Sequence, residues 1–134
     1  APGMPDFGLT PFYQSMGKEA SAAASAITDA FNTQLQANLP SGVLFFDTAA
    51  LMRSVVSDPG AYGFTNVTGY CFDGSTLCEN PEEYLFFDDF HPTTATHQLL
   101  AENFMAAVVP EPSTFLLFFT GLGSLAFLQR RKSH

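Results

Sequence analysis

A carboxylate and an imidazole at the end of an apolar run are the residues best suited to chemistry in this sequence. Asp88 and His91 stand within F-F-D-D-F-H-P-T at residues 86–93. A carboxylate that accepts a hydrogen bond from Nδ1–H of a histidine fixes the tautomer of the ring. It leaves Nε2 free to take a proton from a hydroxyl nucleophile. The pair therefore predicts the base and the orienting acid of a hydrolase.

Two other interpretations of this segment stay open, because a D-x-x-H spacing also arises by chance. Asp88 could cap the following helix, with His91 as an ordinary surface residue. A metal site could use Asp88, Asp89, His91 and His97, although no ligand pattern such as H-E-x-x-H accompanies them. We interpret His97 as a structural residue of the following helix.

Apolar patterns predict the elements that must position this pair. Residues 1–15 are rich in Pro and Gly and predict a loop, and residues 61–83 predict a second, longer loop. We expect helices over 18–38, 48–56 and 93–108, and buried strands over 43–46 and 84–87. The first helix should turn one apolar face inward: Ala20, Ala23, Ala24, Ile27, Phe31 and Leu35.

The order of these elements indicates an α/β fold. Helices that alternate with short, wholly apolar strands imply parallel strands joined by helical crossovers. Open sheets of this kind place ligands at the carboxyl ends of their strands, which is where Asp88 and His91 follow the second run. Two strands are too few for a stable sheet, so we expect further strands before residue 1.

Composition limits the classes of partner. The 134 residues carry 13 acidic and 5 basic residues, with a net charge of −8. Only Lys18 and Arg53 are basic before residue 110, and such an acidic body would repel a nucleic acid. Cys71 and Cys78 lack the spacing and companions of a zinc site. They predict a loop disulfide formed in an oxidising compartment, with two unpaired thiols as the alternative.

Several segments together resemble the SGNH/GDSL ester hydrolases. F-F-D-x-x-H-P-T-x-x-x-H at 86–97 is similar to the last sequence block of that family. Residues 5–11, Phe31-Asn32-x-x-Leu35, and 58–67 followed by the two cysteines fit its preceding segments in order. The resemblance implies the C-terminal portion of a three-layer, flavodoxin-like α/β domain. It also implies hydrolysis of carboxylic esters or lipids without a cofactor, with His91 as base and Asp88 as its orienting acid.

The nucleophile that this resemblance implies is not found. No Ser of residues 1–108 lies in a Gly-Asp-Ser setting, and the chain starts without Met or an export signal. We expect it to be the C-terminal part of a longer exported enzyme, inactive without the upstream Ser block. The alternative is a non-catalytic, surface-sorted protein or an inactive fragment.

The last residues form a separate unit. V-P-E-P-S at 109–113, an uncharged apolar run at 114–128 and the basic residues at 130–132 resemble a PEP-CTERM sorting signal. The resemblance implies processing by an exosortase-type enzyme. The apolar run predicts a transmembrane helix in the inner membrane with its basic end inside, and a buried terminal helix is the alternative. We therefore expect a hydrolase part at 1–108, a tail at 109–134, and export to the cell envelope or beyond.

Overall fold

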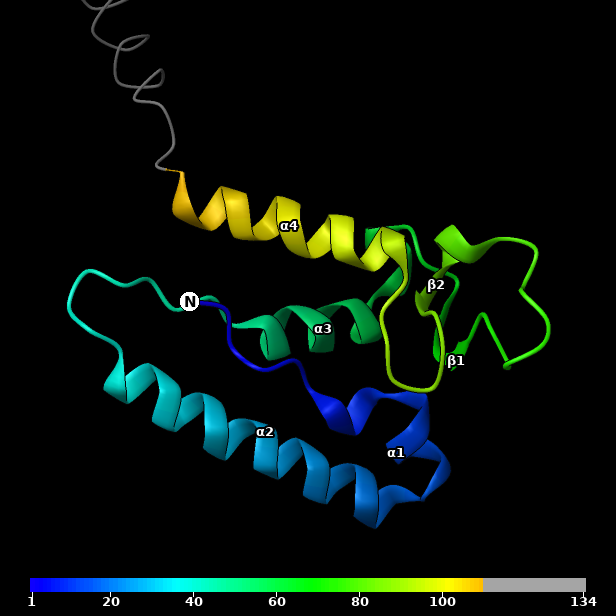
Figure 1. Ribbon diagram of the computed structural model, residues 1–134, viewed down its shortest axis with the longest axis horizontal. Helices are drawn as coiled ribbons and strands as arrows, with labels where there is room; N and C mark the ends of the chain where they lie inside the picture. Colours follow the sequence, from blue (N-terminus) through cyan, green and yellow to red (C-terminus); the bar gives the residue numbers. More distant parts are fainter. Residues whose placement is uncertain (110–134) are drawn as a thin grey trace, which may run out of the picture.

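The computed structural model of the chain describes residues 1–109 (Figure 1). In this view α4, α3 and α2 follow one another from top to bottom, and the two strands lie at the right. The helices are α1 (Pro11–Ser15), α2 (Lys18–Asn38), α3 (Thr48–Ser57) and α4 (Thr94–Val108), and the strands are β1 (Asn66–Tyr70) and β2 (Tyr84–Phe86). Short 3₁₀ turns occupy Phe7–Leu9, Pro59–Tyr62 and Pro81–Glu83.

The predicted transmembrane helix and the rest of the tail lie outside the described residues. Within residues 1–109, none of the helices is long and apolar enough to cross a membrane.

The three long predicted helices are present, and side chains define where two of them begin. The carboxylate of Asp47 accepts a hydrogen bond from Ala50 N at 2.9 Å and caps α3. The hydroxyl of Thr93 accepts one from Thr96 N at 3.2 Å and caps α4. Helix α4 therefore begins at Thr94, one residue later than predicted.

The predicted inner face of α2 is wrong for three of its six residues, because Ala23, Ile27 and Phe31 are exposed. Ile27 and Phe31 are 67% and 49% exposed, whereas Thr28 and Asn32 are buried beside Ala24. The extended N-terminal segment lies along this helix, and its backbone needs hydrogen-bond partners. Asn32 supplies two of them, because Oδ1 accepts from Met4 N at 2.7 Å and Nδ2 donates to Met4 O at 2.8 Å.

Strands β1 and β2 pair in parallel, which agrees with an α/β fold. Residues 61–83 were predicted to be a loop throughout, and β1 corrects that prediction. Its register shifts between the pairs Asn66–Tyr84 and Tyr70–Phe86, so β1 carries an irregularity typical of a bulge. The Asn66 carboxamide accepts a hydrogen bond from Gly69 N at 2.8 Å within that irregularity. Asn and Gly are poor strand formers, which hid this strand in the sequence.

The predicted strand at 43–46 is reduced to a single bridge. Phe46 pairs in parallel with Pro2, through Gly3 N to Phe46 O at 2.8 Å and Phe46 N to Ala1 O at 2.9 Å. Val43 and Leu44 are 44% and 48% exposed rather than buried. A continuous apolar run becomes a buried strand only when neighbours cover its edges and faces. Within residues 1–109 this run pairs its backbone with the N-terminal segment, and Phe46 packs against Phe104 of α4.

The apolar core lies where β2 meets α3. Its buried members are Met52, Val55, Phe64, Leu85 and Phe86. Helix α4 is fastened to β2 by two buried hydroxyls, because Thr96 Oγ1 donates to Leu85 O and Thr93 Oγ1 donates to Tyr84 O, each at 2.7 Å. The segment between β2 and α4 is therefore held firmly at both ends.

Candidate active site

The segment that follows β2 is a tight reversal of the chain. Phe87 N donates to His91 O at 2.7 Å, and Thr93 N donates to Leu85 O at 3.1 Å. An isolated antiparallel bridge joins Phe86 to Pro92. These contacts bring the two ends of residues 87–92, hereafter the dyad loop, together at the carboxyl end of a parallel strand. In Figure 1 this yellow-green loop reaches down from β2 toward α1.

The side chain of Asp88 lies at the centre of the dyad loop. Its Oδ1 accepts backbone hydrogen bonds from Phe90 N at 2.8 Å and from His91 N at 2.6 Å. The His91 ring also faces it, with Nδ1 2.9 Å from Oδ2 and 3.0 Å from Oδ1. The predicted proximity of the two side chains is therefore present.

This geometry distinguishes two interpretations of Asp88, a cap of the following helix and a partner of the His91 ring. The cap of α4 is Thr93, so Asp88 does not cap that helix. His91 is at the surface, with its side chain 77% exposed, but it is also paired with a carboxylate that is 31% exposed. Nε2 of His91 has no hydrogen-bond partner within residues 1–109 and is open to an incoming group.

Opposing effects act on the ionisation of Asp88. Burial alone would raise its pKa, because it disfavours the charged carboxylate. Hydrogen bonds from the backbone of His91 and Phe90 and from the His91 ring, together with the attraction of the imidazolium, outweigh burial. The pKa of Asp88 is therefore lowered from its ordinary value. The carboxylate is kept ionised, which suits a group that orients a histidine and stabilises its charged form.

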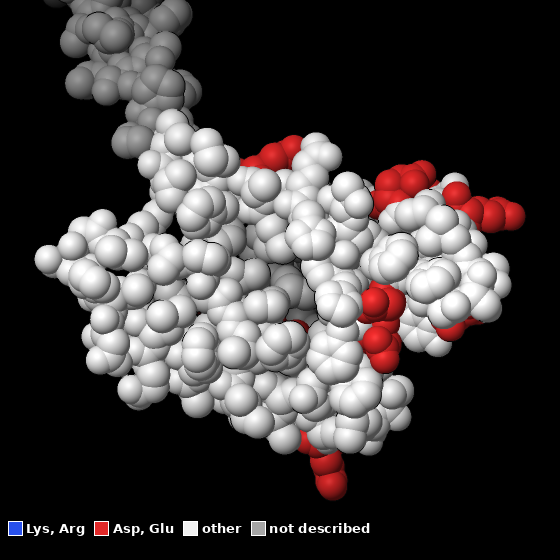
Figure 2. Space-filling view, viewed as in Figure 1, with Lys and Arg blue, Asp and Glu red and all other residues white. Residues whose placement is uncertain are grey.

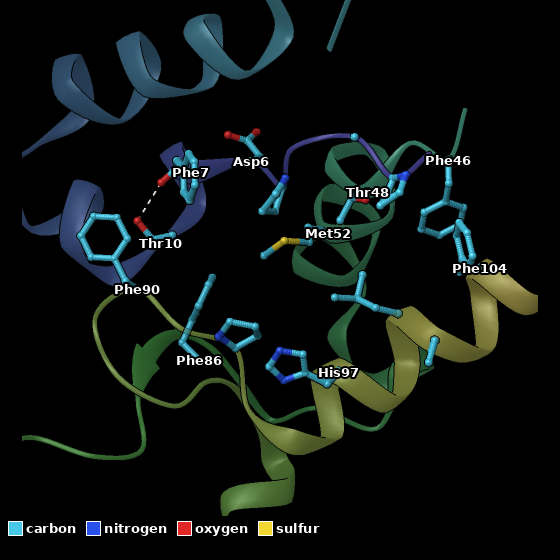
Figure 3. Close-up of a pocket in the computed structure, with 16 residues that line it drawn as sticks. Asp6, Phe7, Thr10, Phe46, Thr48, Met52, Phe86, Phe90, His97 and Phe104 are labelled. Atoms are coloured by element: carbon cyan, nitrogen blue, oxygen red, sulfur yellow. Dashed lines mark hydrogen bonds between the residues drawn. The ribbon is translucent and has the colours of Figure 1, made fainter. Parts of the chain in front are cut away.

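His97 lies apart from this pair. Its Nδ1 is 2.9 Å from Thr93 O, one turn back along α4, and its ring borders an apolar cavity (Figure 3). In the part of the chain that the structure describes, no cluster of three or more His, Cys, Asp or Glu side chains could hold a metal ion. Asp88, Asp89, His91 and His97 therefore do not converge as the metal alternative requires.

The apolar cavity has a volume of about 440 Å³ and opens at the centre of the face shown in Figure 2. Its wall draws on the N-terminal segment, α3, β2, the dyad loop and α4, including Met52, Phe86, Phe90 and Phe104 (Figure 3). Neither Asp88 nor His91 lines it. The sequence did not reveal this cavity, because its residues come from segments far apart in the chain.

A second, more polar hollow of about 450 Å³ does include Asp88. It lies between α1 and the end of β1, and Asp73 and Asp89 also line it. Figure 2 shows further acidic side chains over this end of the molecule and no basic ones on the same face. An anionic group would therefore be repelled from this approach to the dyad loop.

One buried carboxylate elsewhere is fully satisfied. Asp6 is 2% exposed, and its oxygens accept from Ser25 Oγ at 2.7 Å and Gly8 N at 3.0 Å. Arg53 Nε lies 2.6 Å from Asp6, and its Nη2 lies 2.7 Å from Asp29. Hydrogen bonds to both carboxylates raise the pKa of Arg53. This network joins the N-terminal segment to α2 and α3 and has a structural role.

The sequence model of a known family coincides with the part of the chain just described. The model described as GDSL-like lipase/acylhydrolase matches residues 1–104. The chain belongs to the GDSL-like lipase/acylhydrolase family. A second model, described as the PEP-CTERM protein-sorting motif, matches residues 108–132 of this GDSL chain. Both resemblances seen in the sequence are thereby confirmed.

Individual relatives share the family but only part of their length. A GDSL esterase/lipase of Arabidopsis thaliana is 29% identical over 80 residues, which cover 52% of this chain and 22% of the relative. Another from the same plant is 26% identical over 121 residues, covering 74% of this chain and 33% of the relative. The thermolabile hemolysin of Vibrio parahaemolyticus is 30% identical over 79 residues, covering 47% and 19%. The GDSL chain thus spans about a fifth to a third of these curated relatives.

Proposed function

We propose that this GDSL chain supplies the general base, His91, and its orienting carboxylate, Asp88, to a carboxylic ester hydrolase. The observation that carries the proposal is the 2.9 Å contact between His91 Nδ1 and Asp88 Oδ2, with Nε2 left open. Membership of the GDSL-like lipase/acylhydrolase family supports the reaction class. Ester or lipid substrates follow from that class.

In the proposed reaction His91 first accepts a proton as a general base and then donates it as a general acid. Nε2 of His91 takes the proton of a serine hydroxyl while the serine oxygen attacks the ester carbonyl. As the tetrahedral intermediate collapses, the imidazolium returns that proton to the departing alcohol. A water molecule then repeats the cycle on the acyl-enzyme and releases the acid. Asp88 stays ionised throughout and stabilises the imidazolium, which agrees with its lowered pKa.

We place the nucleophilic serine, and the further strands of a three-layer, flavodoxin-like sheet, in a segment outside residues 1–134. The support for this part is the small share of each relative that the GDSL chain covers, 22% and 33% for the two plant enzymes. The described residues form a sheet of two strands, fewer than a stable sheet of this kind needs.

Hydrolysis of p-nitrophenyl butyrate tests the proposal. The GDSL chain would be compared with a form extended upstream along its encoding DNA to any in-frame Gly-Asp-Ser block. We expect activity in the extended form only, and a loss of about 10³-fold or more with His91→Ala or Asp88→Asn. Asp89→Asn is the matched control, since it makes the same change one residue further along.

Two outcomes would contradict the proposal. Full activity of the extended His91→Ala variant would mean that another residue acts as the base. A folded extended form without activity would favour the non-catalytic, surface-sorted protein.

We further propose that residues 109–134 direct export through an exosortase-type enzyme, with residues 114–128 held in the inner membrane as a helix. The support is the match to the sorting motif and the disulfide between Cys71 and Cys78, which fits an oxidising compartment. Deletion of residues 110–134 should move the protein from the membrane fraction to the soluble exported fraction. Membrane association that survives the deletion would refute the anchor.

A further inference from the structure

We propose that Phe12 and Phe72 are positioning residues that hold the dyad loop from two sides and thereby set the contact between Asp88 and His91. Each residue donates one backbone hydrogen bond to the loop and packs its aromatic ring against a ring of the loop. We call each such pair of contacts a clamp. The inference rests on the proposed function of the pair, and it concerns residues that contact the loop and not the substrate.

The first clamp comes from the segment after β1. Phe72 N donates to Phe87 O at 2.7 Å, and the two rings are stacked with centroids 5.5 Å apart and planes at 19°. Phe72 follows Cys71, whose own N donates to Phe86 O at 3.1 Å. The disulfide from Cys71 to Cys78 closes the segment behind it. This clamp is therefore continuous with the pairing of β1 and β2.

The second clamp comes from α1, far away in the sequence. Phe12 N donates to Asp89 O at 3.0 Å, and the rings of Phe12 and Phe90 lie 4.7 Å apart. Phe7 and Tyr13 add edge contacts to Phe90 at 6.2 and 5.9 Å. Figure 3 shows Phe90 beside Phe7 and Thr10 of the N-terminal segment.

The two clamps meet the loop on either side of Asp88. Their acceptors, Phe87 O and Asp89 O, are the carbonyls of the residues before and after it. Asp88 and His91 are at the surface, where water competes for every hydrogen bond of the pair. Fixing both flanking peptides keeps the Asp88 carboxylate under Phe90 N, His91 N and the His91 ring. Without the clamps these hydrogen bonds would be made only part of the time.

The pKa of Asp88 reports this positioning, because hydrogen bonds made within the dyad loop are what lower it. Other charges near it are the carboxylates of Asp73 and Asp89, which line the same hollow. The pKa of Asp73 is also lowered, by hydrogen bonds from Thr76 and Ser75 in its own turn. Asp73 therefore serves as an internal reference when Phe12 is changed.

The experiment follows Asp88 and Asp73 by carboxyl ¹³C NMR and the His91 ring by ¹⁵N NMR in the full chain. We expect Phe12→Ala and Phe72→Ala each to shift the pKa of Asp88 toward its ordinary value, and the double variant to shift it further. The fraction of His91 with its proton on Nδ1 should fall in parallel. Phe31→Ala is the matched control, since Phe31 is 49% exposed on α2 and distant in sequence from the loop, and it should leave Asp88 unchanged.

The proposal is overturned if the double variant keeps the wild-type pKa of Asp88 and the wild-type tautomer of His91, or if Phe31→Ala shifts them as much. Should an alanine variant fail to fold, Phe12→Leu and Phe72→Leu retain an apolar side chain and the backbone donor, and a smaller shift is expected. Phe12→Tyr keeps the ring and should restore the wild-type values. This readout does not depend on ester hydrolysis, so the clamps and the proposed function can fail independently.

Discussion

The same four residues, Leu-Phe-Phe-Asp, occur twice in this GDSL chain and have different structures. At 44–47 the leucine is 48% exposed, and the aspartate caps α3 directly. At 85–88 the leucine is fully buried, and the aspartate folds the dyad loop around itself to meet His91. Identical local sequence therefore does not decide burial or role in this molecule.

The difference lies in the neighbours of each run. The second run has β1 beside it and the core residues of α3 against it. Helix α4 is also fastened to it, because Thr96 donates to the carbonyl of Leu85 and Thr93 to that of Tyr84, just before the run. The first run meets the N-terminal segment at the single bridge between Pro2 and Phe46. A strand gains stability from the surfaces that cover it, and its composition only makes that burial possible.

The largest test of this comparison substitutes the two equivalent leucines. Leu85→Ala should lower the free energy of unfolding by about 3 kcal/mol, because it leaves a cavity in the core. Leu44→Ala should change it by less than about 0.5 kcal/mol, as for other exposed positions. Urea unfolding followed by circular dichroism measures both. Equal losses would mean that the first run is as buried as the second.

A smaller loss of stability is expected at Asn32, which holds the N-terminal segment, the partner of the first run, against α2. Asn32→Ala removes both hydrogen bonds to Met4 and leaves its partly buried backbone N–H and C=O without these partners, which should cost about 2 kcal/mol. The neighbouring exposed residue offers a control, and Phe31→Ala should cost less than about 0.5 kcal/mol. A larger loss of stability for Phe31→Ala than for Asn32→Ala would mean that the apolar face predicted from the sequence is the buried face of α2.

The third test compares the roles of the two aspartates. Asp47→Ala should cost about 1 kcal/mol through loss of the cap of α3, and Asp47→Asn almost nothing, since asparagine caps equally well. At position 88 asparagine should not be equivalent, because the His91 ring requires an ionised partner. Thermal unfolding of Asp47→Ala, Asp47→Asn and Asp88→Asn at pH 7 measures whether asparagine replaces aspartate at position 47 but not at position 88.

The smallest effect is the dependence of stability on pH. The pKa of Asp88 is lower in the folded chain than its ordinary value, so its ionisation stabilises the fold above about pH 4. That contribution is lost as the pH falls through the folded pKa. The stability difference between wild type and Asp88→Asn should therefore shrink between pH 6 and pH 3. A difference that stayed the same over this range would contradict the role given to the Asp88 carboxylate.

The dyad was predictable because all its parts lie within one loop. The spacing of Asp88 and His91, the apolar run before them and the helix after them place both side chains without distant contacts. The family resemblance then added the chemistry, which spacing alone could not supply.

Most of the errors concern features that depend on distant segments. The short helix α1 is the exception: residues 1–15 were predicted to be a loop, but Pro11 lies in the first turn of this helix, where its missing N–H is tolerated. The buried face of α2 follows from the backbone of Met4, which no periodicity reveals. Strand β1 contains Asn66 and Gly69 and becomes a strand by pairing with β2. The apolar cavity likewise draws its wall from segments scattered over the chain.

The disulfide between Cys71 and Cys78 means that part of the structure forms only after the chain has been synthesised and oxidised. Cys71 and Cys78 are thiols when the chain is synthesised, and the turn that they close carries Phe72 against the dyad loop. Oxidation closes that turn, and Phe72, which lies between the two cysteines, contacts Phe87, the residue before Asp88. A GDSL chain kept in a reducing cytoplasm would contain every residue of the pair and lack the last covalent constraint upon it.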